Sequence, residues 1–157
     1  MSLFEDQNFR WRETYFVLFP RKHRPDHQET DQLIYHLSQS CSLSEIRLDE
    51  QGRLESVSVL SATDHAAMDI CFLAGVDVQD QVTEFLGELA PAALSTDDQE
   101  KLDLLRECDA RFEVFHFERI QEGEEFLDPS TLFNILDQLA TAVAGVAIDP
   151  QAATFVG

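Results

Sequence analysis

The sequence has few glycines, and none of them lie close together. The six glycines stand at positions 52, 75, 87, 123, 145 and 157, never closer than twelve residues. Phosphate-binding loops place several glycines within one turn, so the usual nucleotide-binding motifs are excluded. The chain also lacks a G-x-S-x-G elbow, an H-E-x-x-H pair and a C-x-x-C pair. No motif argues for catalysis, and no cofactor or metal is expected.

Cysteines and long apolar runs are scarce as well. Cys41, Cys71 and Cys108 are an odd number of thiols with no close pair, which favours a reducing cytosol over a disulfide framework. The longest apolar runs, Tyr15–Phe19 and Ile70–Ala74, are five residues each, far short of the roughly 20 that a membrane helix needs. The first residues carry no apolar core of secretory length. The sequence therefore predicts a cytoplasmic protein without a membrane segment.

Basic residues are scarce and unevenly placed. The net charge is −19, from 30 acidic and 11 basic residues. Such a charge repels phosphate backbones and anionic lipids, so nucleic acid and membrane surfaces are poor candidates for partners. Residues 1–24 nevertheless carry a balance of +2, whereas the remaining residues carry −21. This asymmetry favours a basic protein, or a second copy of the chain, as the partner.

The apolar content is high enough for a folded core. Apolar residues make up 44% of the 157 residues, including twelve phenylalanines, and a chain of this length fits one domain. We expect residues 1–10 to be a loose tail and residues 11–157 to form a single α+β domain.

The pattern of apolar residues predicts both strands and helices. Residues 13–19 and 111–120 are apolar on both faces at their centres, which is typical of strands buried on both sides. Shorter alternating segments predict strands at 44–49, 54–60, 66–73, 146–148 and 154–156. Helical spacing predicts helices at 26–39, 81–90, 96–107 and from 128 to a stop at Gly145, the first opened by a capping box of Asp26 and Glu29.

The two ends of the chain repeat one order of elements. Each has a doubly buried strand, a link, a helix, a strand, an acidic turn and a further strand, over residues 13–60 and 111–156. We therefore predict one mixed sheet of about six or seven strands with helices mainly on one face. The order also raises the hypothesis of two pseudo-symmetric β-α-β-β halves, each with a parallel strand pair crossed by its helix.

The segment Arg21-Lys22-His23-Arg24 is the first candidate binding site. It leads from a buried strand into a helix N-terminus, where partial positive charge and free N–H groups attract a small anion or a phosphate, so the segment is a candidate ligand or partner contact. A solvated charged loop has the same sequence, so both interpretations stay open. Trp11, between Arg10 and Arg12, is a candidate contact because Trp and Arg are favoured in binding hot spots; it could equally tie the N-terminal tail to the domain.

His116 and Asp69 are the only candidates for acid–base chemistry. His116 sits mid-strand with Glu118 on its own strand face, and a histidine near a carboxylate can act as a general base. A neutral, hydrogen-bonded core histidine fits the same pattern. Asp69 lies inside a strand, where burial would raise its pKa, whereas exposure would make it an ordinary surface carboxylate.

Three functions follow from these features. The first is a non-catalytic, acidic binding or protein-interaction domain, since the chain has no catalytic motif and a charge suited to a basic partner. The second is a small enzyme that uses His116 and Asp69. The third is a subunit of a homo-oligomeric assembly. The balance of the sequence leans away from an enzyme.

Overall fold

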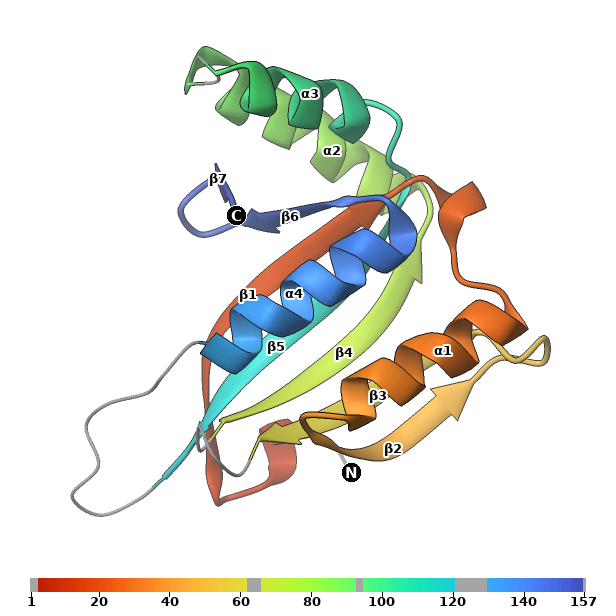
Figure 1. Cartoon of the computed structure of the whole chain (residues 1–157). Coiled ribbons are helices and arrows are strands. Elements are labelled where there is room, and N and C mark those ends of the chain that lie inside the picture. The colour runs from red at the N-terminus through yellow and green to blue at the C-terminus, as the bar shows by residue number, and fades with distance from the viewer. Residues whose placement is uncertain (1–2, 62–65, 93–94, 121–129, 157) are drawn as a thin grey trace.

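The computed structural model describes residues 3–61, 66–92, 95–120 and 130–156 (Figure 1). Within them, seven strands form one sheet in the order β2-β3-β4-β5-β1-β6-β7, and four α-helices pack on it. The strands are β1 (Phe9–Phe19), β2 (Ser42–Leu48), β3 (Leu54–Ser61), β4 (Ala66–Ala74), β5 (Ala110–Arg119), β6 (Val146–Asp149) and β7 (Thr154–Phe155). The helices are α1 (His27–Ser38), α2 (Val76–Leu89), α3 (Thr96–Leu105) and α4 (Ser130–Val143). The predicted α+β fold with one sheet of about six or seven strands is confirmed, and the sheet has seven.

Neighbouring strands in the sheet are antiparallel throughout. Helix α1 joins β1 to β2, and α4 joins β5 to β6, and in each case the two strands run in the same direction. They are not neighbours, however, because β5, β4 and β3 separate β1 from β2, and β1 separates β5 from β6. The two halves therefore share an order of elements but not a spacing, and the expected adjacent parallel pairs do not form. The long strand β1 takes the position between β5 and β6 instead.

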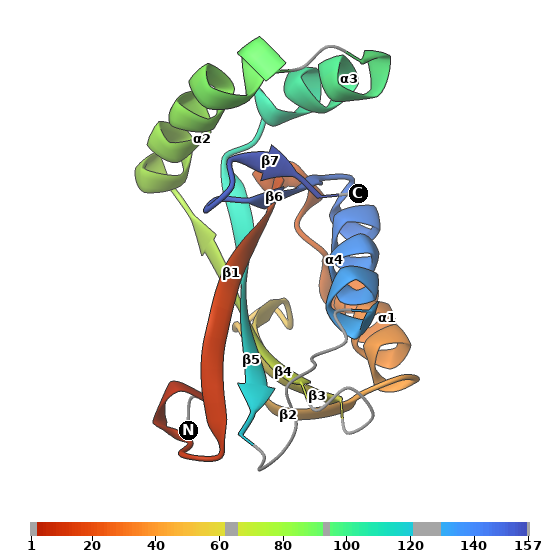
Figure 2. The same cartoon turned by 90° about the vertical axis from the view of Figure 1, so that its left-hand side faces the viewer.

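The helices cover both faces of the sheet (Figure 2). Helices α1 and α4 pack on one face, against residues such as Val17, Phe112 and Ile70. Helices α2 and α3 pack on the other face, against Phe16 and Leu18 of β1. The expectation of helices mainly on one face is thus corrected. The cause is β1 itself, whose central residues are apolar on both sides, as its sequence predicts.

The helix ends show where local sequence signals hold. Asp26 caps α1 in the predicted capping box, with its side chain accepting from the N–H of Glu29. Helix α2 starts at Val76, five residues before the predicted start, because Gly75 with a φ of 129° turns the chain straight from β4 into the helix. At the end of α4, the left-handed residue is Ala144 (φ 49°), not the predicted Gly145. No helix among the described residues has the length and apolar character that crossing a membrane requires.

The N-terminal segment is attached to the sheet rather than loose in its described part. Residues Leu3–Glu5 form a short 3-10 turn, and β1 already begins at Phe9. The ring of Phe4 lies edge-on against the rings of Phe115 and Phe117, with centroids 5.3 and 4.8 Å apart. The N–H of Leu3 donates to Oδ2 of Asp69. The composition of residues 1–10 hides this because most of these residues are polar or charged.

Candidate functional site

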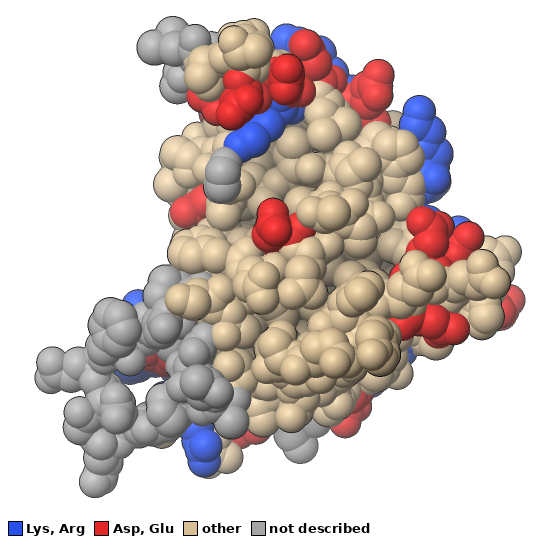
Figure 3. Space-filling model, viewed as in Figure 1, with Lys and Arg blue, Asp and Glu red and all other residues tan. Residues whose placement is uncertain are grey.

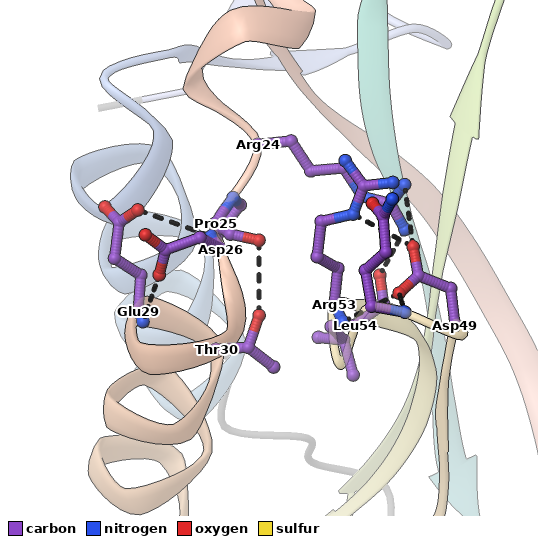
Figure 4. A network of polar contacts seen from close by, with 9 residues as sticks. Arg24, Pro25, Asp26, Glu29, Thr30, Asp49, Arg53 and Leu54 are labelled. Atoms are coloured by element: carbon purple, nitrogen blue, oxygen red, sulfur yellow. Dashed lines mark hydrogen bonds and ion pairs between the residues drawn. The ribbon is translucent and has the colours of Figure 1, made fainter.

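Arg24, the last residue of the basic segment between β1 and α1, serves the fold (Figure 4). The guanidinium of Arg24 lies over the ring of Phe72, 3.6 Å from its centroid. It donates to the carbonyl oxygen of Leu54 at 3.1 Å and lies 3.5 Å from a carboxylate oxygen of Asp49. The side chain of Arg24 is only 10% exposed. Arg24 therefore ties the start of α1 to the β2–β3 turn instead of facing a partner.

Asp49 gathers several donors in this network. Its carboxylate accepts from the backbone N–H groups of Arg53 and Gln51 and from the guanidinium of Arg53, each at 2.9 Å. The backbone N–H of Arg53 contributes most to lowering the pKa of Asp49, against a smaller opposing effect of burial. Asp49 thus stays ionised and fixes the turn against Arg24 and Arg53.

Of the remaining residues of the basic segment, one contacts the fold and two are exposed. Nδ1 of His23 lies 3.1 Å from the carbonyl oxygen of Val143. His23 therefore provides a hydrogen-bond partner for the last residue of α4. Arg21 and Lys22 are exposed. The structure therefore does not bring the four predicted side chains into one site, and only Arg21 and Lys22 remain accessible to a partner.

Trp11 remains a surface residue. Its side chain is 43% exposed, and its indole N–H donates to Oγ1 of Thr14 at 3.1 Å. Its neighbours Arg10 and Arg12 both pair with Glu118. These two hydrogen-bonding arginines lower the pKa of Glu118, although burial alone would raise it.

His116 is buried on the sheet face that carries α1 and α4. It is 1% exposed, and its Nδ1 lies 2.8 Å from Oε1 of Glu13. The carboxylate partner is therefore Glu13 of β1, not Glu118 as the strand pattern indicated. The other ring nitrogen, Nε2, is buried and has no hydrogen-bond partner among the described residues. His116 does not line the hollow between α3 and α4 or the two smaller hollows near Asp69 and between α1 and α4.

Asp69 and His116 lie on opposite faces of the sheet. His116 pairs across the ladder with Met68, and Asp69 pairs with Phe115; paired residues share a face and successive residues alternate. Asp69 is 8% exposed and accepts from the hydroxyl of Ser58 at 2.6 Å. The two side chains therefore cannot form one acid–base pair.

The thiols do not form a reactive site either. Cys41, Cys71 and Cys108 are free. Burial, with smaller contributions from Asp109 and Glu107, raises the pKa of Cys108 to about 12. Burial also raises the pKa of Cys71, helped by Asp69 and Glu113. A raised pKa keeps a thiol protonated and unreactive, which fits the role of small apolar residues.

The described surface is hollowed by a groove between α3 and α4, which we call the α3–α4 groove. Its volume is about 920 Å³, within the range of ligand-binding clefts. It lies at the β6 end of the sheet, where α3 of one face approaches α4 of the other. Most of its wall and floor is apolar: Leu104, Phe133, Leu136, Ala140, Ala144, Val146, Ala147 and Val156.

Carboxylates stand on both sides of this groove. Asp97 and Glu100 belong to α3, and Asp137 belongs to α4. One cation, Lys101, also lines the groove, and its ammonium lies over the ring of Phe155 at 5.5 Å. Figure 3 shows acidic side chains gathered over α3 and a mostly uncharged surface over α4 and β6. The groove therefore combines an apolar floor with acidic edges.

Sequence reasoning missed the groove, although part of its signal is present. The residues that α4 contributes at 133, 137, 140, 141 and 144 follow helical spacing beside the buried stripe. In α3, positions 97, 100, 101 and 104 do the same. Each set resembles an ordinary solvent-facing helix side. Only the approach of α3 to α4 turns the two sides into one concave surface.

Comparisons of the chain with protein-family models, with curated proteins and with solved structures found no match. The function therefore has to be argued from the geometry above.

Proposed function

We propose that this chain is a non-catalytic interaction domain that binds a partner protein in the α3–α4 groove. The observation that carries the proposal is the groove itself, a volume of about 920 Å³ with an apolar floor. A concave apolar surface of this size is the usual form of a recognition site. Neither histidine nor cysteine stands among its described lining residues, and the greater part of that lining is apolar, so the site offers mainly shape and apolar area.

The whole-chain charge supports a partner that is basic. With a net charge of −19, long-range attraction speeds the approach of a cationic protein and repels an anionic one. The three free thiols support a reducing, cytoplasmic location for the domain. The alternative enzyme built on His116 and Asp69 gains no support, because these residues lie on opposite faces of the sheet.

A substitution in the groove tests the proposal. Phe133 lines the groove and is 45% exposed, so Phe133→Ser removes apolar contact area from the groove, together with one edge-on contact to the ring of Tyr15. The matched control is Tyr35→Ser, because Tyr35 is an aromatic residue of α1, 63% exposed and outside the groove. The tagged wild-type chain and both variants are used to capture proteins from a lysate of the source cells, at low and moderate salt, with thermal unfolding as a check on folding.

The proposal expects one stoichiometric partner that the wild type and Tyr35→Ser retain and Phe133→Ser loses. Capture that Phe133→Ser leaves unchanged would place the binding surface elsewhere and reject the groove. Capture of only further copies of this chain, lost in the same variant, would identify the domain as an assembly subunit.

A further inference from the structure

The shape of the α3–α4 groove also defines the kind of segment that it accepts. Its two walls are helices of 14 and 10 residues, about 21 and 15 Å long at 1.5 Å per residue. The residues that line the groove span positions 97–104 of α3 and positions 133–144 of α4 and the residue after it, about two and three helical turns, which is enough wall to contact a short third helix. The inference developed here rests on the function proposed above and concerns the occupant of that same groove.

The hydrogen bonds that the bound segment's backbone needs distinguish a helix from an extended strand. An extended peptide needs hydrogen bonds from a free strand edge, because unpaired N–H and C=O groups are costly to bury. At the groove floor, Val146 and Ala147 of β6 pair with β1, and the carbonyl oxygen of Ala147 also accepts from the backbone N–H of Val156. The walls are helix sides whose own backbone groups are used internally. A helix brings its own hydrogen bonds with it and therefore fits this groove better than a strand.

The charged residues at the groove edges indicate which charge the flanks of that helix should carry. Asp97 and Glu100 stand on the α3 side and Asp137 on the α4 side, so both flanks of a bound helix face carboxylates. Lys101 offsets part of this charge, but its ammonium lies toward Phe155. Phe133 and Leu136 of α4 and Leu104 of α3 belong to the apolar part of the lining. The apolar stripe of the occupant meets this part of the lining while its flanks meet the carboxylates.

We propose that the α3–α4 groove binds an amphipathic helix of a partner protein, with an apolar stripe bordered by Lys or Arg on both sides. The contact is of the helix-in-groove type, with anchors spaced i, i+3, i+4 and i+7. Because exposed carboxylate–ammonium contacts are screened by salt, binding weakens as ionic strength rises. The apolar stripe supplies affinity and the carboxylates select the sign of charge.

Three synthetic peptides of about 14 residues, the length of α4, test this inference. The first has a leucine stripe with lysines on both flanks, the second has the same stripe with glutamates, and the third is a scrambled version of the first. Binding to the full chain is measured by fluorescence anisotropy at low and moderate salt, and the contact is located by backbone amide shifts. The variants are Phe133→Ser and Asp137→Lys, and the controls are Tyr35→Ser and Asp80→Lys, whose positions lie outside the groove.

The inference expects only the lysine peptide to bind, with amide shifts confined to α3, α4 and β6. Phe133→Ser weakens it by about tenfold, as loss of an aromatic anchor does, and Asp137→Lys weakens it by about two- to fivefold, in keeping with an exposed charge contact. Tyr35→Ser and Asp80→Lys stay close to the wild type, and unchanged thermal unfolding shows that the variants are folded.

Two results would overturn it. Equal binding of the lysine and glutamate peptides, unaffected by Asp137→Lys, would reject the basic flanks. Absence of binding by every helical peptide would reject the helix. In both cases, a native partner that Phe133→Ser still fails to capture would leave the interaction function in place, so the two proposals fail separately.

Discussion

Arg24 combines three contacts that a surface arginine does not make. Its guanidinium stacks on Phe72, donates to the backbone of Leu54 and faces Asp49. Planar stacking and forked donation are properties of arginine that lysine lacks. At this position, a residue from a charged and seemingly solvated segment has become part of the packing between α1 and the β2–β3 turn.

Replacement of Arg24 is therefore expected to destabilise the fold. Arg24→Ala lowers the free energy of unfolding by about 2 kcal/mol, because it removes a charged hydrogen bond and a cation–π contact from a nearly buried position. Arg24→Lys falls between the alanine variant and the wild type. Urea unfolding measures the differences.

The matched control for this series is Arg21→Ala, because the side chain of Arg21 is exposed. It should stay within about 0.5 kcal/mol of the wild type. Equal losses for Arg21→Ala and Arg24→Ala would contradict the role of the Arg24 contacts.

Tyr15 provides a pH test at the same scale. Burial, and then the charges of Glu13 and Asp149, raise the pKa of Tyr15 to about 12, above the roughly 10 of an unfolded chain. Below pH 10 the Tyr15 hydroxyl is protonated in both the folded and the unfolded state, so its full contribution to the stability of the folded state is present. As the pH rises toward 12, the unfolded state ionises first, so the folded state loses stability.

The free energy of unfolding of the wild type, relative to that of Tyr15→Phe, should therefore decrease from pH 10 to pH 12. Urea unfolding at closely spaced pH values follows the difference, and a titration of tyrosinate absorbance should lose its step near pH 12 in Tyr15→Phe. Tyr35→Phe serves as the control because it leaves Tyr15 intact. A step near pH 12 that survives Tyr15→Phe would show that another group produces it.

At the scale of elements, Gly145 determines how closely the end of α4 approaches β1. A Cβ at this position would lie 2.3 Å from the carbonyl oxygen of Leu18 and 3.0 Å from Cβ of Phe19. The first distance involves backbone and is shorter than real contacts allow. Glycine is therefore required for close packing between α4, β6 and β1, not for the left-handed turn, which Ala144 supplies.

Two glycine-to-alanine substitutions should have opposite effects. Gly145→Ala lowers the free energy of unfolding by about 2 kcal/mol, since β1 must shift to admit the methyl group. Gly87→Ala raises it by about 0.5–1 kcal/mol, because Gly87 lies inside α2 with nothing within 4 Å of its added Cβ. Urea unfolding of both variants measures this contrast, and a loss at position 87 or a gain at position 145 would refute it.

At the scale of the whole molecule, the region of α2 and α3 carries a substantial share of the excess negative charge. Residues 76–107, which include α2 and α3, hold nine acidic and two basic side chains. Mutual repulsion within such a surface opposes folding, and salt screens it. The same residues contribute one wall of the proposed binding groove, so the charge costs stability while it attracts a basic partner.

Salt should therefore stabilise the free protein. Raising sodium chloride from about 0.01 to 0.15 M shortens the screening length from roughly 30 to 8 Å, and the midpoint of thermal unfolding is expected to rise. A series in which glycerol replaces salt controls for effects unrelated to charge. A midpoint that falls or stays constant with salt would show that attractive ion pairs, such as Arg24–Asp49, outweigh the repulsion.

The sequence by itself determined the class and the order of the elements. Apolar periodicity placed every strand of the described sheet, and the capping box at Asp26 located the start of α1. The doubly apolar centre of β1 correctly indicated a strand covered on both faces. These features depend on residues that are close to one another in the chain, so the local sequence pattern is enough to predict them.

Only the tertiary structure decided strand order, side-chain partners and the groove. Pairing of β1 with β5 and β6 gave His116 the partner Glu13 and put Asp69 on the other face. The fold also turned Arg24 inward and set α3 beside α4. Each outcome joins residues far apart in the chain, where the energy depends on which surfaces meet in space. A periodic pattern shows that a side chain has a buried or exposed face, but the packing of whole elements determines what that face touches.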